Sequence, residues 1–482
     1  MRVRPPCSSP RPTVSLRPLL LALALGSAPV LRAAEPVAPF SEAETLQHFQ
    51  SLVSIESTDP PGSEIAVTEY LTRVLLAEGI EVETYALPDQ PQRPNLVARL
   101  RGNGSKRPLL LMAHQDTVNV DAARWAFPPF SATRDSGWIY GRGTLDDKDN
   151  LTASLVTMLA LKRSGAVLDR DVIFLAESGE EGAFHVGIKF MVANHYDAID
   201  AEFCLAEGGS VRRVQGRAES VGIGTTEKLP RALALTAHGI AGHASVPLQS
   251  NAVVRLSRAI TRVAEWQPPV RLSDITTSYF AQLARIASDP ASRARYQAVL
   301  NPGSPEAAAA IAYFRAEEPA TAAILSSTVS PTLVDAGYRI NVIPSETSAT
   351  LDTRLLPDES EAEFLAAVTA VVADPSVEVS WVPRDDATGA SSSLDTDAYR
   401  IIERVYAEAY QAPVLPLTGT GATDSRFLRA KGMQCYGVGP GIDAEDAPLG
   451  YGAHSDQERI LESELQRFVK TYYDIVVALA AP

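Results

Sequence analysis

Cysteine is scarce in this chain, because only three of its 482 residues are cysteines. Cys7 lies in an N-terminal segment that we expect to be removed, which leaves Cys204 and Cys435. A fold that depends on a disulfide framework is therefore excluded, while one disulfide and two free buried thiols both remain compatible with the sequence.

Positive charge is also in short supply. Lysine and arginine together number 43, against 58 aspartates and glutamates, and the net charge is −15. A surface of this sign repels nucleic acid and anionic membranes. We therefore expect no nucleic-acid partner and no stable membrane association of the mature protein.

Long apolar runs are missing after residue 34. Before it, LLLALALGSAPVL at residues 19–31 follows a stretch without acids that contains Arg2, Arg4, Arg11 and Arg17. This pattern is typical of a secretory signal peptide and is short for a membrane span. We predict a signal peptide over residues 1–34 and a periplasmic or secreted protein. An uncleaved signal anchor stays open, because cleavage after Ala34 places Arg32 where a small residue is preferred.

The order of helix-like and strand-like segments predicts two domains, which the length of the chain also favours. Residues 41–220 alternate the two patterns, as an α/β sheet requires, with apolar strands expected at 94–100, 107–114, 171–177 and 201–207. Residues 220–383 differ: they include an Ala-rich helical stretch at about 285–325 and an alternating antiparallel strand at 347–357. We predict a mixed sheet flanked by helices from residues 35–221 and 384–482, with an α+β domain, 222–383, inserted into it.

Histidines and carboxylates follow the predicted strands. His114 ends one strand and Asp116 follows it, Glu180 and Glu181 follow the next, and a third strand leads to Glu207. His454 lies in a glycine-rich turn near the C-terminus. Taken singly, each has an ordinary structural explanation, such as a surface histidine or a solvated loop glutamate. Together they lie where an α/β sheet places its site, and a thiol-free set of this kind suits hard or borderline divalent metals.

The segment GRGTLDDKDN, residues 141–150, contains three aspartates. A calcium loop of the EF-hand type beginning at Asp147 is excluded, because Leu151 and Thr152 stand where it needs an oxygen ligand and a glycine. Asp149 precedes an apolar periodic stretch, so we predict that it caps the helix over 149–165.

Eight short motifs occur in an order that resembles a known metallohydrolase family. They are HQD (114–116), GRGTLDDK (141–148), GEEG (179–182), EGG (207–209), GHASVP (242–247), NVIPSETSATLDTRLLP (341–357), GATDSR (421–426) and HSDQE (454–458). The chain resembles the dinuclear zinc family of aminoacylase, carnosinase, succinyl-diaminopimelate desuccinylase, glutamate carboxypeptidase and carboxypeptidase S. It is most similar to the carboxypeptidase S-like branch, through YGRGTLDDK. The resemblance implies a zinc-peptidase-like catalytic domain with an inserted lid and dimerisation domain.

The resemblance also implies two divalent ions in each subunit, zinc first, with cobalt or manganese as alternatives. It assigns His114 and Glu207 to one ion, Glu181 and His454 to the other, Asp146 to both, Glu180 as general base and Asp116 as the residue that orients His114. Two positions depart from the family pattern: Asp149 replaces a glycine after the lysine of the DDK motif, and Ala422 replaces a second glycine. Neither departure removes a ligand.

In the lid, the resemblance implies that His243 comes from the partner subunit of a homodimer and hydrogen-bonds the oxyanion. Arg354 would bind the carboxylate of the substrate, and Asn341 and Thr423 would contact the substrate. The expected activity is hydrolysis of an amide bond next to a free carboxylate in a small peptide. An N-acyl amino acid amidohydrolase is the alternative, and a non-enzymatic alternative is an inactive binding or scaffold homologue. The complete set of ligands together with Glu180 counts against inactivity.

Overall fold

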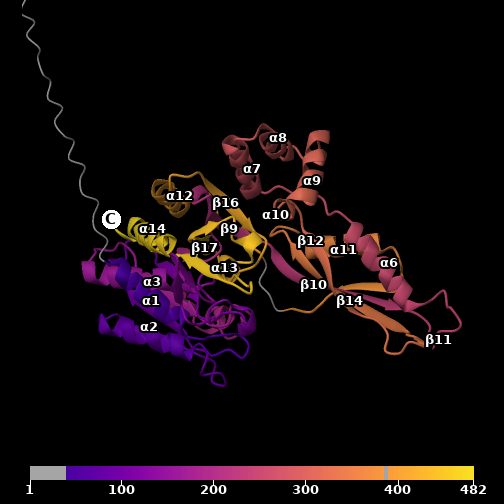
Figure 1. Ribbon diagram of the computed structural model, residues 1–482, viewed down its shortest axis with the longest axis horizontal. Helices are drawn as coiled ribbons and strands as arrows, with labels where there is room; N and C mark the ends of the chain where they lie inside the picture. Colours follow the sequence, from indigo (N-terminus) through magenta and orange to yellow (C-terminus); the bar gives the residue numbers. More distant parts are fainter. Residues whose placement is uncertain (1–39, 385–388) are drawn as a thin grey trace, which may run out of the picture. The chain divides into compact units, whose positions relative to one another are not determined.

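The computed structural model describes residues 40–384 and 389–482. Its main feature is a mixed ten-stranded sheet with the order β1-β2-β6-β3-β7-β17-β9-β8-β18, in which β16 also pairs with β9 (Figure 1). The strands are β1 Val82–Tyr85, β2 Asn95–Leu100, β3 Leu109–His114, β6 Val172–Glu177, β7 Phe203–Ala206, β8 Ser210–Val214, β9 Arg217–Glu227, β16 Val414–Gly419, β17 Gln434–Gly437 and β18 Gly441–Asp443. Its central strands β6, β3 and β7 run parallel.

Helices cover both faces of this sheet, so its central strands are buried on both sides. Leu109 and Leu111 of β3 pack into one core, and Leu110 and Met112 pack into the other. The first core is closed by α1 Glu42–Val53, α2 Ile65–Ala77, α3 Lys148–Ser164, α12 Asp397–Tyr410 and α14 Glu462–Ala480. The second is closed by α4 Ile188–Asn194, α5 Tyr196–Ile199 and α13 Ser425–Arg429. Burial on both faces explains the continuous apolar runs of these strands.

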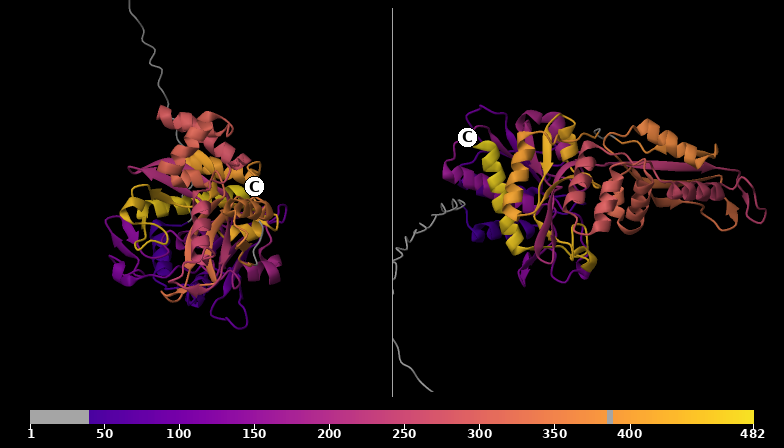
Figure 2. Two further views of the ribbon diagram at one scale, coloured as in Figure 1. Left: turned by 90° about the vertical axis from the view of Figure 1, so that its right-hand side faces the viewer. Right: turned by 90° about the horizontal axis from the view of Figure 1, so that it is seen from above.

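A second sheet comes from the middle of the chain. Its antiparallel strands have the order β12 Thr328–Asp335, β14 Glu346–Leu355, β10 Leu229–His238 and β15 Val377–Trp381. The helices α6 Ala252–Glu265 and α11 Glu361–Val372 pack on it (Figures 1 and 2). Along β14, buried residues alternate with partly exposed ones, as predicted for this strand.

Four helices share a small core of their own; three come from the predicted helical stretch at about 285–325 and one precedes it. The remaining elements are short. The four are α7 Asp274–Ile286, α8 Pro290–Val299, α9 Pro305–Glu317 and α10 Pro319–Ala323. Ser304 accepts a hydrogen bond from the Ala307 amide and so caps α9, directly before Pro305. The short elements are β4 Thr133–Asp135, β5 Trp138–Tyr140, β11 Gly242–His243, β13 Val342–Ile343, β19 Arg459–Leu461 and the 3₁₀ helices Ala122–Arg124 and Ala447–Leu449.

The domain boundaries drawn from the sequence stay a prediction. Ala38–Pro482 forms one compact unit, and β9, which crosses the predicted boundary at residue 221, stays in the ten-stranded sheet up to Glu227. The predicted signal peptide, 1–34, lies outside the described residues. Within the described residues, no helix has the length and apolar character that a membrane crossing requires. Cys204 and Cys435 are free thiols, buried opposite each other on β7 and β17.

Candidate metal centre

Three neighbouring parallel strands deliver site residues to one edge of the large sheet. His114 is the last residue of β3, and Glu207 directly follows the last residue of β7. The strand β6, which pairs with β3 on the side away from β7, leads into the loop that carries Glu180 and Glu181. The carboxyl ends of parallel strands are where α/β sheets place ligand sites, so the predicted residues meet for a topological reason.

The structure brings the five predicted metal ligands into two groups that share Asp146. Donor atoms of His114, Asp146 and Glu207 lie within 4.8 Å of one another, and this group is called the first cation site below. Donor atoms of Asp146, Glu181 and His454 satisfy the same limit of 4.8 Å and form the second cation site. Asp146 Oδ1 lies 2.9 Å from His114 Nε2, and Asp146 Oδ2 lies 3.1 Å from His454 Nε2. One carboxylate thus faces both groups.

The charges in this cluster suit divalent cations. Burial and then the charge of Glu180 raise the pKa of Glu207 well above its usual range. Hydrogen bonds to Asp146 and Glu181 raise the pKa of His454 to about 10. Burial alone would lower the pKa of His114, but its hydrogen bond to Asp146 and the surrounding carboxylates raise it well above its usual value. Carboxylates crowded together in this way repel one another, and bound divalent cations would supply the positive charge that relieves the repulsion. Nitrogen and oxygen donors without thiols fit zinc, cobalt or manganese.

Glu180 lies beside these groups and belongs to neither. Its side chain is buried, and burial followed by the charge of Asp424 raises its pKa well above the usual range. A carboxyl group of raised pKa next to a cation site, yet free of ligation, has the properties of a general base.

Asp116 contacts His114 through its main chain. Its carboxylate lies 3.7 Å from His114 Nδ1, and it is instead the main-chain oxygen of Asp116 that hydrogen-bonds this nitrogen at 3.0 Å. The carboxylate accepts hydrogen bonds from the amides of Gly179, Glu180 and Glu181. Asp116 therefore orients His114 through its carbonyl group and holds the glutamate loop through its side chain. With Nδ1 donating to that carbonyl, Nε2 is the nitrogen left to bind a metal.

The other two aspartates of the 141–150 segment are structural, and the predicted cap is wrong. Helix α3 begins at Lys148, and the carbonyl of Asp147 accepts the first helical hydrogen bond, from Leu151, so Asp147 occupies the N-cap position. The Asp147 carboxylate accepts from the His114 amide and from Asn150. Asp149 lies within the first helical turn, and its buried carboxylate has no hydrogen-bond partner among the described residues.

Sequence reasoning missed four buried charged residues around the centre. They are Glu177, Arg142, Asp424 and Glu458. The last three stand inside the quoted motifs, so motif membership was an available signal. Glu177 is the exception, although it ends the strand β6; burial raises its pKa to about 8.

The predicted substrate residues lie in different places. Thr423 donates a hydrogen bond to Glu227 at 2.8 Å and lies beside Gly208, the residue after Glu207. Arg354 forms a two-pronged ion pair with Asp352 on β14.

His243 and Asn341 lie near each other, in the region of the β11–β13 pair. The main-chain oxygen of Asn341 accepts from the Ala244 amide, and Nδ1 of His243 accepts from the Ser245 amide. Neither of them belongs to the two cation groups, and the roles of all four substrate residues stay predictions.

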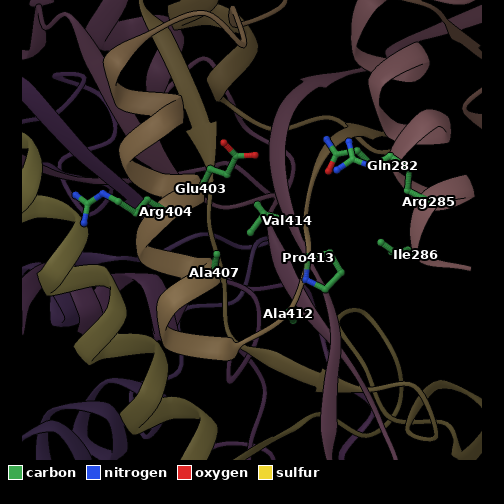
Figure 3. Close-up of a pocket in the computed structure, with 9 residues that line it drawn as sticks. All are labelled: Gln282, Arg285, Ile286, Glu403, Arg404, Ala407, Ala412, Pro413 and Val414. Carbon is green, nitrogen blue, oxygen red and sulfur yellow. The ribbon is translucent and has the colours of Figure 1, made fainter.

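A separate pocket of about 330 Å³ lies between α7 and α12. Figure 3 shows Gln282, Arg285 and Ile286 of α7 on one wall and Glu403, Arg404 and Ala407 of α12 on the other. No predicted site residue lines it, so we do not assign the reaction to it.

Comparison with known proteins links this geometry to a family. Residues 110–478 match the model of a family described as peptidase family M20/M25/M40. The N-fatty-acyl-amino acid synthase/hydrolase PM20D1 of Xenopus tropicalis is 29% identical over 376 residues, which are 77% of this chain and 72% of that protein. The probable carboxypeptidase S-like 2 of Dictyostelium discoideum is 26% identical over 388 residues, 77% of this chain and 72% of that protein.

Solved structures show the same fold. The M20 family metallo-carboxypeptidase Sso-CP2 from Sulfolobus solfataricus has a TM-score of 0.67 at 18% identity, covering 90% of this chain and 98% of that one. Human carnosine dipeptidase 1 has a TM-score of 0.63 at 14% identity, covering 91% and 96%. The predicted fold class, a mixed sheet flanked by helices, is confirmed.

Proposed function

The chain belongs to peptidase family M20/M25/M40, a family of dinuclear metal-dependent hydrolases, and from this premise we propose that it cleaves an amide bond next to a free carboxylate in small peptides. One observation carries the proposal: two groups of metal-binding side chains share Asp146, and the buried Glu180 lies beside them without belonging to either. We further propose that both groups hold zinc, with cobalt or manganese as substitutes.

The chain's own residues supply the proton transfers. Two divalent ions held by the groups that share Asp146 would lower the pKa of a water molecule and polarise the acyl oxygen. Glu180 takes a proton from the attacking water and passes it to the leaving nitrogen. Asp116 keeps Glu180 in place, because the Asp116 carboxylate accepts hydrogen bonds from the main-chain amides of the loop that carries Glu180.

N-acyl amino acids are the second candidate substrates. They share the amide bond and the adjacent carboxylate with a dipeptide, and the Xenopus relative is named as an N-fatty-acyl-amino acid synthase/hydrolase. In both cases we propose that Arg354 receives the carboxylate. This guanidinium already binds one carboxylate, that of Asp352, with two hydrogen bonds, and the same planar geometry serves a substrate carboxylate.

We propose that two copies associate through the region of the second sheet. Its edge strand β12 exposes Leu333 by 66%, and Ile340, next to Asn341, is 100% exposed. Exposed apolar side chains on a strand with a free edge favour pairing with another chain. A second copy at this surface would bring His243, which lies on the nearby β11, to the partner's centre.

Export is also part of the proposal. It rests on residues 1–34, where four arginines without acids precede the apolar run at 19–31. Sequencing the N-terminus of the protein recovered from the periplasm or medium tests it: a mature chain that begins near residue 35 supports export, and an intact N-terminus in the cytoplasm contradicts it.

The decisive assay compares amine release from matched substrates. The protein without residues 1–34, loaded with zinc, cobalt or manganese, is incubated with dipeptides and with N-acyl amino acids of short and long chain. Each substrate is paired with its C-terminal amide, which lacks the free carboxylate. We expect turnover of the acids, little turnover of the amides, and none with Glu180→Ala. A protein that binds two ions but releases amine from neither substrate class contradicts the proposal.

A further inference from the structure

The two cation sites are supported in different ways. His114 and Glu207 of the first site are attached to the ends of β3 and β7, inside the large sheet. In the second site, Glu181 lies in the loop after β6, and two further loops carry the other ligands: residues 141–147 carry Asp146, and residues 451–458 carry His454. These loops extend from paired strands, because Tyr140 of β5 pairs with Arg459 of β19.

A buried ion pair joins the two loops. Arg142 Nη1 lies 2.7 Å from Glu458 Oε2, and the side chains are 3% and 0% exposed. Both residues lie in the quoted motifs, but the family resemblance assigns neither of them a role. Removing one partner of such a pair leaves a buried charge without a counter-charge, which is strongly destabilising. The pair therefore constrains the two loops that carry its members.

Each member of the pair also binds the main chain of the opposite loop. Glu458 accepts hydrogen bonds from the amide of Gly143 at 3.1 Å and from the amide of Leu145 at 2.7 Å. Leu145 directly precedes Asp146 in the chain. In return, Arg142 Nη2 donates to the main-chain oxygen of Ser455, the residue after His454, at 2.7 Å.

We propose that Arg142 and Glu458 are positioning residues that set the distance between Asp146 and His454 and thereby assemble the second cation site. The pair touches no ligand side chain and acts through the main chain on both sides of the site. Asp146 remains beside His114 through a contact that does not involve the pair. Breaking the pair should therefore weaken the second site and spare the first. This inference rests on the proposed function for the identity of the ligands.

The test is a titration of the metal-free protein with Co²⁺, followed by calorimetry and by the visible absorption of bound cobalt. For Glu458→Gln we expect one ion to bind within about twofold of the wild-type affinity and the other about 10- to 100-fold more weakly. Glu207→Gln and Glu181→Gln give the spectra of proteins impaired at the first and second site, and Glu458→Gln should match the latter.

Two further variants separate positioning from general stability. Arg142→Lys keeps the charge but has one amine for two acceptors, so we expect an intermediate loss at the second site. Glu464→Gln is the matched control, because Glu464 is also buried and paired with an arginine, Arg213 at 3.5 Å. It should lower the unfolding temperature and leave both affinities unchanged.

The outcomes are distinguishable. If folded Glu458→Gln or Arg142→Lys loses affinity equally at both sites, or at neither, the positioning role is wrong. If Glu458→Gln does not fold by circular dichroism, Arg142→Lys decides by the same criterion. Failure of the wild-type protein to bind two Co²⁺ ions contradicts the proposed function, whereas two ions without turnover leave the positioning role intact.

Discussion

Substitution of Asp146 gives the most direct test of the proposed metal centre. Its two carboxylate oxygens face different histidines, His114 and His454, at 2.9 and 3.1 Å. If one carboxylate serves both cation sites, Asp146→Asn must weaken the binding of both ions. Glu207 belongs to the first site alone, so Glu207→Gln must weaken the binding of one ion only.

The size of the effect follows from linkage between binding and unfolding. At an ion concentration about 100-fold above the dissociation constant, each site adds about 2.7 kcal/mol to the free energy of unfolding, and two add about 5.4 kcal/mol. The unit Ala38–Pro482 has an unfolding entropy of about 0.9 kcal/mol per kelvin if it unfolds cooperatively. Bound ions should therefore raise the unfolding temperature of the wild-type protein by about 6 °C.

The assay measures the unfolding temperature with and without Co²⁺ or Zn²⁺, together with the metal content of the dialysed protein. We expect a rise of about 3 °C for Glu207→Gln and of less than about 1 °C for Asp146→Asn. A rise for Asp146→Asn that equals that of Glu207→Gln, with one ion retained, would refute a shared ligand and leave two independent sites.

Three other changes test the remaining assignments. Glu180→Ala should abolish amine release while the protein keeps two ions, because a general base is not a ligand; loss of metal in this variant would make Glu180 a ligand instead. Mixing inactive His243→Ala with inactive Glu180→Ala should restore part of the activity through mixed dimers, and no recovery after confirmed subunit exchange would contradict a role of His243 in the partner's site. Burial raises the pKa of Asp149 well above its usual value, so the folded chain keeps a proton that the unfolded chain releases above about pH 4, and stability falls as pH rises. Asp149→Asn should reduce that fall in denaturant titrations between pH 5 and pH 8, and an unchanged slope would show that Asp149 is not the group responsible.

The sheet, and the places of His114 and Glu207 at the ends of its strands, were accessible from the sequence because strand periodicity determines both. A strand buried on two faces has a continuous apolar run, and the residue at its carboxyl end lies at the functional edge. His114 and Glu207 follow such runs directly. The grouping of the ligands came from the family resemblance, since spacing along the chain does not determine which loops meet.

The wrong cap prediction concerns competition between neighbouring aspartates for one position. Asp149 resembles a cap in the sequence, yet Asp147 already provides the first carbonyl of α3, so the helix starts earlier and encloses Asp149. Asp116 reaches His114 through its main-chain oxygen, and three amides of the following loop occupy its carboxylate. A residue type indicates what a side chain can accept; the fold determines which donors reach it.

The link between the two loops was beyond sequence reasoning for a physical reason. Arg142 and Glu458 are 316 positions apart, and nothing in either motif identifies the partner among 43 basic and 58 acidic residues. A buried carboxylate is costly without a cation, so the burial of Glu458 demands a partner, but only the pairing of β5 with β19 brings Arg142 within reach. The second cation site therefore depends on strand pairing outside the large sheet, and its geometry is established only when β5 and β19, which are far apart in the sequence, have paired.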